Sequence, residues 1–268
     1  MSVGEIDNYM NAVAEVATLA GNVARRYYGG NPEVQTKRDG SPVSVADFEA
    51  ERAAREWIEK NFPADGIIGE ELSTTREAAK RRWILDPIDG TFTFLQNVPL
   101  WGTLVAVVEG EQVIAGAAYF PALEETIVAA PGKGAWWNGS RTNVSQVSAL
   151  KAARLVTTDA RFNRDLSRRD RWLELQNGAQ AMRTWGDCYG YLLVATGRAD
   201  VMVDDVISVW DGAALLPVIT EAGGVFTDWK GRTTAFGGDA IATNSLLADA
   251  VRDILVAPAL RDSSSPNS

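Results

Sequence analysis

The sequence predicts a mixed α/β protein, and three observations support that class. Apolar residues recur at helical spacing over residues 5–28 and again over 44–61. Four β-rich runs separated by turn residues follow between positions 101 and 137, which predicts an antiparallel meander. From residue 154 onward strand and helix patterns alternate, as is typical of α/β architecture.

The first two helices are predicted from their apolar spacing and their end signals. Residues 5–28 form an amphipathic pattern that ends at Gly29. After a turn-rich loop, Ser44 has the position of an N-cap, with Asp47 as the third helical residue. This is a capping box with Asp in place of Glu. We expect the second helix to end near Asn61.

The middle of the chain reads mainly as strands. We expect a short strand at 67–68, followed by a polar segment at 73–82 that is mobile or helical. Residues 83–85 form a buried strand that should end at Pro87, because proline has a fixed φ and no N–H to donate. The strands of the meander are predicted at 101–108, 112–120, 124–130 and 134–137.

The second half is predicted as alternating strands and helices. The strands are expected at 154–157, 200–203, 224–227 and 238–243. The helices are expected at 165–176, 185–197, 211–223 and 245–256. We therefore expect an N-terminal α+β half at 1–150, a C-terminal α/β half at 151–260 and a disordered Ser- and Asp-rich tail at 261–268.

Composition and charge restrict the possible functions. With 268 residues, 46% of them hydrophobic, the chain can bury a sizeable core. The net charge of −9 argues against a nucleic-acid-binding surface. A single cysteine, Cys188, excludes an intrachain disulfide and favours a reducing compartment. No apolar run is long enough to span a bilayer, and the first twenty residues lack the basic region of a signal peptide.

The sequence contains no histidine. This excludes Ser-His-Asp and Cys-His catalysis as well as His-ligated zinc sites. Any acid–base chemistry must therefore be carried out by carboxylates, hydroxyls, lysine, tyrosine or metal-bound water.

The run from Trp83 to Thr91 concentrates the residues that could carry chemistry. Asp86 and Asp89 flank a proline turn, Gly90 lets the backbone approach a ligand, and Thr91 adds a hydroxyl. Hard oxygen ligands at this density suit Mg²⁺ or Mn²⁺. The alternative is a strand that simply ends in an Asp-rich turn.

Two further motifs accompany this run. Gly69-Glu70-Glu71 lies upstream, and Trp210-Asp211-Gly212-Ala213-Ala214 lies downstream, ahead of Glu221-Ala222-Gly223-Gly224. In this order the motifs resemble the inositol monophosphatase family of Mg²⁺-dependent phosphomonoesterases, from about the first helix to Leu255. The resemblance implies a layered αβαβα sandwich of the inositol monophosphatase and fructose-bisphosphatase type. It also implies a homodimer that acts on a small phosphate monoester. From the cysteine count, the net charge and the apolar runs we expect a cytoplasmic protein with neither nucleic acid nor membrane as a partner.

The resemblance also implies a metal site. Glu70 and Asp86 would hold one ion with the carbonyl of Ile88, while Asp86, Asp89 and Asp211 would hold a second. Two or three Mg²⁺ ions are expected in all, and Mn²⁺ can substitute.

The remaining roles follow from the same resemblance. Asp47 and Thr91 would orient the attacking water, which Glu70 would contact through the metal. Gly90 and Thr91 would bind the phosphate. Glu71 and Lys37 would hold the metal ligands in place. The alternatives are a helix cap for Asp47 and a solvated charge for Lys37.

Substrate specificity is expected to lie in the second half. The run from Trp185 to Tyr191 and the runs at 99–104, 193–197, 208–211 and 238–244 are most similar to the histidinol-phosphate phosphatase branch. That branch hydrolyses L-histidinol phosphate to L-histidinol and phosphate in histidine biosynthesis. Asp187 and Asp204 would bind the cationic leaving group, although Asp187 could instead cap its helix.

Several other functions are alternatives to this one. An inositol-1-monophosphatase is the first alternative, followed by a nucleotide or sugar phosphatase of the same family. A haloacid-dehalogenase-type phosphatase uses an Asp-x-Asp-x-Thr motif after its first strand, whereas the acids here are spaced Asp-x-x-Asp-Gly-Thr and lie deep in the chain. A non-enzymatic metal-binding regulator would need no Asp47–Thr91 pair.

Overall fold

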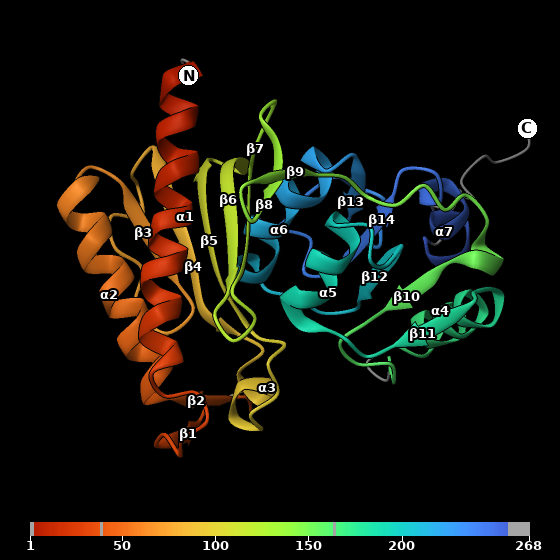
Figure 1. Ribbon diagram of the computed structural model, residues 1–268, viewed down its shortest axis with the longest axis horizontal. Helices are drawn as coiled ribbons and strands as arrows, with labels where there is room; N and C mark the ends of the chain where they lie inside the picture. The colour runs from red at the N-terminus through yellow and green to blue at the C-terminus, as the bar shows by residue number, and fades with distance from the viewer. Residues whose placement is uncertain (1–2, 38–39, 163–164, 257–268) are drawn as a thin grey trace, which may run out of the picture.

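The chain folds into five layers in which helices and sheets alternate (Figure 1). The computed structural model describes residues 3–37, 40–162 and 165–256, so the predicted tail at 261–268 lies outside the described residues. The helices are α1 (Val3–Arg25), α2 (Val45–Asn61), α3 (Thr91–Leu95), α4 (Leu166–Gly178), α5 (Asp187–Ala195), α6 (Val209–Glu221) and α7 (Ala248–Leu255), with a 3-10 turn, η1, at Leu150–Ala152. None of these described helices is long and apolar enough to cross a membrane.

The first sheet has seven strands in sequence order and is covered on one face by α1 and α2. Its strands are β3 (Gly66–Gly69), β4 (Arg81–Asp89), β5 (Gly102–Glu109), β6 (Gln112–Phe120), β7 (Glu125–Ala130), β8 (Gly134–Trp137) and β9 (Ser140–Thr142). Only the β3–β4 pair is parallel, so the predicted antiparallel meander is confirmed. Val13 and Val16 of α1 are fully buried in one cluster with Trp83 and Val107 of the sheet.

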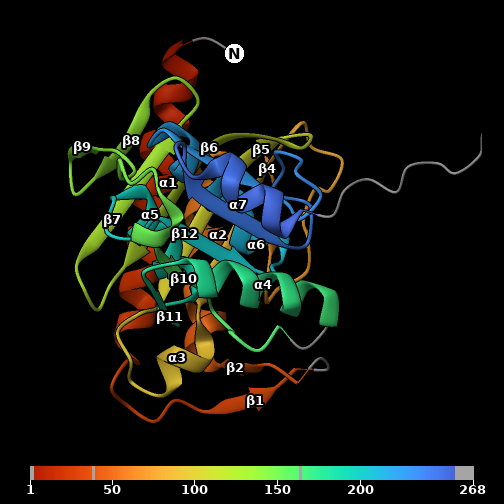
Figure 2. The ribbon, with the colours of Figure 1, turned by 90° about the vertical axis from the view of Figure 1, so that its right-hand side faces the viewer.

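The second sheet has five strands in the order β11-β10-β12-β14-β13. They are β10 (Arg154–Val156), β11 (Ala181–Arg183), β12 (Val201–Asp204), β13 (Gly224–Thr227) and β14 (Ala240–Asn244). Helices α4 and α7 cover its outer face, which faces the viewer in Figure 2. A separate small hairpin, β1 (Val34–Thr36) with β2 (Pro42–Ser44), precedes α2.

Helices α5 and α6 form the middle layer between the two sheets (Figure 1). One buried cluster contains Ile84 of the first sheet, Val218 of α6 and Met202 of the second sheet. The core is therefore continuous across the predicted boundary between residues 1–150 and 151–260. That these halves are separate domains stays a prediction.

Strand β4 does not end at Pro87, as the sequence suggested, but continues to Asp89. Its register with β5 shifts between Asp86, which pairs with Leu104, and Asp89, which pairs with Gly102. Two residues of β4 thus oppose one of β5, which is a β-bulge. Because the proline lies in the bulge, its missing N–H breaks no regular ladder hydrogen bond.

Other local predictions also differ from the structure. The segment at 73–82 is not helical: Thr75 forms a bridge with Ile67, and β4 already begins at residue 81. Helix α5 begins at Asp187, two residues later than predicted. The short elements α3, β9 and β11 were not predicted, because three to five residues give too little periodicity to recognise.

Candidate active site

Three carboxylates from distant parts of the chain converge at one point. Asp86 and Asp89 lie at the end of β4, and Asp211 lies in the first turn of α6, which packs against β4. Each offers a carboxylate oxygen, and these oxygens lie within 4.8 Å of one another. The structure therefore brings together three of the acids that were predicted to bind metal.

Two helices each position one acid of the site through a capping box at the helix N-terminus. Ser44 caps α2 and Ser208 caps α6, and in each helix the third residue is an aspartate that completes a capping box. Asp47 Oδ2 accepts hydrogen bonds from the backbone N and the hydroxyl of Ser44, at 2.7 Å each. Asp211 Oδ2 accepts one from the backbone N of Ser208, also at 2.7 Å. Capping therefore fixes both side chains at helix starts.

Burial and mutual repulsion dominate the electrostatics of the three converging acids. Burial raises the pKa of Asp86 well above its usual range, and the charges of Glu70, Asp89 and Asp211 raise it further. Burial also raises the pKa of Asp89, followed by the charges of Asp187 and Asp211. The pKa of Asp211 is raised to about 6, mainly by burial. Such a set of carboxylates binds protons or cations in preference to remaining fully charged.

Glu70 and Glu71 follow β3 and approach the site from another side. The Glu70 N–H donates to the carbonyl of Leu85 in β4, at 3.1 Å. Lys37 Nζ lies 2.5 Å from Glu70 Oε1 and 2.7 Å from Glu71 Oε1. Burial raises the pKa of Glu71 to about 7, with a further contribution from the charge of Glu70. Lys37 thus holds the two glutamates together, although Glu70 is not one of the three closely spaced acids.

Glu51 supports this loop and was not recognised in the sequence. Its buried carboxylate accepts hydrogen bonds from the backbone N–H groups of Glu71, at 2.8 Å, and Leu72, at 3.2 Å. Arg55, one turn further along α2, donates to Glu51 at 2.7 Å and to the Leu72 carbonyl at 2.9 Å. A Cβ at position 69 would lie 2.0 Å from Glu51 Oε1, so only glycine fits there. The sequence signal that could have identified Glu51 is the spacing of Asp47, Glu51 and Arg55, which are four residues apart and therefore lie on one face of the helix.

The structure places Asp47 and Thr91 side by side. Thr91 Oγ1 lies 3.3 Å from Asp47 Oδ1 and 3.0 Å from the carbonyl oxygen of Ile88. Burial raises the pKa of Asp47, while the hydrogen bonds from Ser44 lower it. Gly90, with φ of 85°, forms the left-handed turn that leads into α3. The first backbone N–H groups of a helix have no hydrogen-bond acceptor within that helix. Gly90 and Thr91 stand at this position in α3.

Asp187 lies against the Gly90 turn. A Cβ on Gly90 would meet Asp187 Oδ2 at 2.9 Å. Thr93 donates to the same oxygen at 3.0 Å, and the Asp187 N–H donates to Thr158 Oγ1 at 2.8 Å. The backbone of Asp187 is left-handed, with φ of 50°, which is uncommon for a residue other than glycine. The chain therefore adopts an unfavourable backbone conformation that places this carboxylate beside the turn.

Asp204 is buried at the end of β12, and both its oxygens have protein partners. Oδ1 accepts the Thr158 N–H, and Oδ2 accepts the Tyr191 hydroxyl, both at 3.0 Å. Burial raises the pKa of Asp204 to about 7. Thr158 therefore connects Asp187 to Asp204, and of these two acids Asp187 is the more accessible.

The donor set can be tested against a divalent metal. The converging side chains offer only carboxylate oxygens, with the Ile88 carbonyl nearby, and no thiolate donor takes part. All-oxygen sets suit Mg²⁺ and Mn²⁺ rather than zinc or copper. The arrangement of the described acids fits a divalent cation.

Comparisons with known proteins identify the family of the chain. The model of the inositol monophosphatase family matches residues 5–264. A histidinol-phosphatase from Chlorobaculum parvum is 41% identical over 231 residues, which cover 85% of this chain and 89% of the relative. A histidinol-phosphatase from Mycobacterium tuberculosis is 36% identical, over 91% of this chain and 96% of the relative. The solved structure of an inositol monophosphatase from Zymomonas mobilis superposes with a TM-score of 0.84 at 30% identity, covering 95% of this chain and 99% of that one. The predicted sandwich is thus confirmed, and the chain belongs to the inositol monophosphatase family.

Proposed function

We propose that this protein is a metal-dependent phosphomonoesterase whose preferred substrate is L-histidinol phosphate. The observation that carries the proposal is the position of Asp187 beside the Gly90–Thr91 turn. This places a carboxylate for a cationic leaving group next to the turn proposed to bind phosphate. The two histidinol-phosphatase relatives support the same substrate.

The metal site is proposed on the converging acids. Asp86, Asp89 and Asp211 would hold one Mg²⁺ ion, and Glu70 with Asp86 and the Ile88 carbonyl would hold another. When bound, such ions neutralise phosphate charge and lower the pKa of a coordinated water. Glu71 and Lys37 keep Glu70 in place through the Lys37 contacts.

Thr91 and Asp47 are proposed to orient the attacking water. Ser44 occupies Asp47 Oδ2, so Oδ1 is left to accept the Thr91 hydroxyl proton. With its proton directed to Asp47, the Thr91 oxygen can accept a hydrogen bond from water. The water oxygen would attack phosphorus while the Thr91 hydroxyl proton moves to Asp47 Oδ1 and Thr91 Oγ1 takes up a proton from the water. The bond from phosphorus to the ester oxygen would break, and the leaving alkoxide would take up a proton from solvent water. Backbone N–H groups of Gly90 and Thr91 would bind the phosphate.

A phosphate-release screen tests the substrate. The assay compares L-histidinol phosphate, inositol phosphate, fructose bisphosphate and adenosine bisphosphate at equal Mg²⁺, and we expect the highest kcat/KM for L-histidinol phosphate. A higher value for inositol phosphate would overturn the substrate assignment and leave the phosphatase proposal standing.

Inositol-1-monophosphatase activity is the alternative, supported by the close superposition on the Zymomonas mobilis structure. In both cases the enzyme is proposed to be a cytoplasmic homodimer. Sedimentation of the purified protein tests the dimer, and cell fractionation tests the location.

A further inference from the structure

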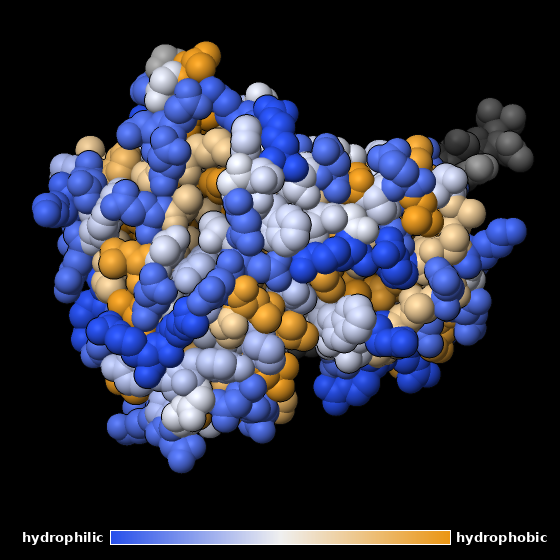
Figure 3. Space-filling model, viewed as in Figure 1, coloured by the Kyte–Doolittle hydropathy of each residue, from blue (hydrophilic) through white to orange (hydrophobic). Residues whose placement is uncertain are grey.

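Several arginines near the surface of the described chain hold their guanidinium groups over aromatic rings, which is a stabilising cation–π arrangement. The pairs are Arg81 with Tyr9, Arg141 with Trp136, Arg168 with Trp229, and Arg198 with both Trp137 and Tyr189. Figure 3 shows one face of the molecule, on which hydrophilic residues separate the exposed hydrophobic ones into small patches. The Arg168 pair has a further property, because it is hydrogen-bonded to the chain that leads from Asp204 to Asp211.

Arg168 lies in the first turn of α4, on the outer face of the second sheet (Figure 2). Its guanidinium carbon lies 4.9 Å from the centre of the Trp229 ring. Its Nη2 lies 2.7 Å from Asp239 Oδ2, and its Nη1 donates to the carbonyl of Asp205 at 3.1 Å. Asp165, which caps α4, is farther away, at 3.9 Å from Nε. The guanidinium is therefore held in three directions, by a ring, a carboxylate and a carbonyl.

Trp229 takes part in the same arrangement through both of its N–H groups. The indole Nε1 donates to the carbonyl of Asp204 at 2.9 Å, and the backbone N–H donates to Asp239 Oδ1 at 2.8 Å. Trp229 and Asp239 are both buried. A chain that leaves a strand needs new donors for its carbonyls, because the neighbouring strand no longer supplies them. Here the carbonyls of two consecutive residues, Asp204 and Asp205, receive donors from side chains on the outer face of the sheet.

The segment that follows β12 leads directly to Asp211. The Ile207 N–H donates to the carbonyl of Gly238 at 3.0 Å, which adds a third bond to those of the two carbonyls. Ser208 then caps α6, and its N–H donates to Asp211 Oδ2. The position of the Asp211 carboxylate therefore depends on where residues 204–208 are held.

We propose that Arg168 is a positioning residue for the metal site: it holds residues 204–208 from the outer face of the second sheet and so fixes the place of Asp211. The inference rests on the proposed role of Asp211 as a metal ligand and adds a residue outside the site to it. The effect passes through backbone groups, from the Asp205 carbonyl to the N–H of Ser208. Binding sites need their side chains within about 0.5 Å of the productive geometry, so a small movement of this segment weakens metal binding.

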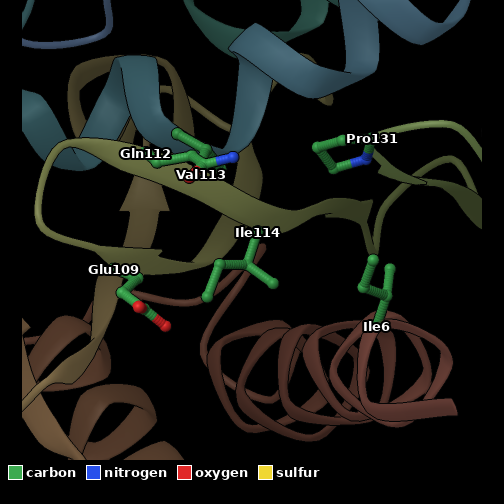
Figure 4. Close-up of a pocket in the computed structure, with 6 residues that line it drawn as sticks. All are labelled: Ile6, Glu109, Gln112, Val113, Ile114 and Pro131. Carbon is green, nitrogen blue, oxygen red and sulfur yellow. The ribbon is translucent and has the colours of Figure 1, made fainter. Parts of the chain in front are cut away.

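The Arg81 cluster has similar chemistry but lies far from the site. Arg81 lies over the Tyr9 ring and 3.4 Å from Glu109 Oε2. Glu109 lines a cavity of about 250 Å³ between α1 and the β5–β6 hairpin (Figure 4). Arg81 and Asp89 are the two ends of β4, so they lie about 26 Å apart at about 3.3 Å per residue. Arg81 is therefore a matched control, an arginine with a ring and a carboxylate as partners at the opposite end of the strand from the proposed ligand.

The test measures Mn²⁺ binding and amide hydrogen exchange on the purified full-length protein. For Arg168→Gln we expect the Kd for Mn²⁺, measured by calorimetric titration, to rise about threefold to tenfold. Amide exchange of a peptide that spans residues 205–212, measured without added metal, should become about tenfold faster. The reason is that the hydrogen-bonded N–H groups of Ile207 and Gly212 would open more often. Arg81→Gln should lower the melting temperature and cause neither change.

Three further variants separate the hydrogen bonds from the charge. Arg168→Lys keeps the charge but lacks the planar fork that joins a carboxylate and a carbonyl, so both measurements should lie between those of wild type and Arg168→Gln. Trp229→Phe keeps the ring and removes the Nε1–H that binds the Asp204 carbonyl, so it should shift both measurements in the same direction by about threefold. Arg169→Gln removes the neighbouring exposed charge and should change neither.

The outcomes distinguish this inference from the proposed function. Unchanged exchange of residues 205–212 in Arg168→Gln, or an increase spread evenly over the chain, would overturn the inference. An Arg168→Gln protein that opens this segment faster yet binds Mn²⁺ as tightly as wild type would also overturn it. If the wild type binds no Mn²⁺, the proposed metal mechanism fails, while the exchange data still decide whether Arg168 holds the segment and Asp211.

Discussion

The two ends of the site differ in how closely their acidic side chains are spaced. At the end proposed to bind metal and phosphate, Asp86, Asp89 and Asp211 each offer an oxygen within 4.8 Å of the others, and burial is the main cause that raises the pKa of all three. At the leaving-group end, Asp187 and Asp204 are separated by Thr158, which binds both of them. A crowded set of acids attracts any divalent cation, whereas a single accessible carboxylate can distinguish one leaving group from another. Catalysis and specificity should therefore respond to different substitutions.

The largest effect is expected at the crowded end. Asp89→Asn removes one ligand charge and should lower kcat/KM by at least about a thousandfold on every ester, because metal stabilisation of the transition state is lost. EDTA should have the same effect on the wild-type enzyme. Calorimetric titration with Mn²⁺ should show weaker binding to the variant, while circular dichroism shows an unchanged fold. Full activity of the metal-free wild-type protein would contradict the metal mechanism.

The next effect is expected at Asp47 and Thr91, the pair proposed to orient water. Thr91→Ala should lower kcat by about a hundredfold to ten-thousandfold and change KM much less, because the hydroxyl acts on the water and not on the substrate. Single-turnover kinetics should show the loss in the chemical step. Trapping of a phospho-aspartate at Asp86 or Asp89 would disprove direct attack by water.

A smaller effect is expected from Glu51, which is fully buried and contacts the loop after Glu70 through the N–H groups of Glu71 and Leu72. Glu51→Gln removes the charge that binds the N–H groups of Glu71 and Leu72 and should raise the Mg²⁺ concentration needed for half-maximal activity about tenfold to a hundredfold. Excess Mg²⁺ should restore most of kcat. Glu56→Gln on the exposed face of α2 is the matched control. A fall in melting temperature with unchanged Mg²⁺ dependence would mean that Glu51 serves stability alone.

The phosphate end was easier to predict from the sequence than the leaving-group end. The capping box at Ser44 and Asp47 is a local pattern, so it could be recognised before the structure was known, and α2 begins as expected. Asp86, Asp89 and Asp211 belong to compact motifs that resemble those of the family, and this resemblance implied that the three acids meet, as they do in the structure.

What could not be predicted depends on contacts between distant segments. Periodicity in the sequence does not indicate three features of the second half. These are the left-handed backbone at Asp187, the contacts of Thr158 with Asp187 and Asp204, and the strand order β11-β10-β12-β14-β13. The continuation of β4 through Pro87 depends on a bulge against β5. Glu51 lies in an ordinary helical pattern, and its role became visible only when the loop after β3 was placed beside it.

The smallest expected effect on selectivity is that of Asp204, which should instead affect stability. Its pKa in the folded protein is about 7, above the value of about 3.9 for an unfolded chain. The folded state therefore binds an extra proton between these two values, so the free energy of unfolding falls as pH rises through this window and levels off above pH 7. From pH 5 to pH 8 this contribution is about 2–3 kcal/mol.

Asp204→Asn removes this titration. The difference in unfolding free energy between wild type and variant, measured by urea denaturation at fixed Mg²⁺, should shrink by that amount between pH 5 and pH 8. The substitution should lower hydrolysis of cationic and neutral esters alike, because both Asp204 oxygens already bind Thr158 and Tyr191. Parallel stability curves would show that Asp204 is ionised throughout. A loss confined to L-histidinol phosphate would instead return Asp204 to direct recognition of the leaving group and remove the contrast with Asp187.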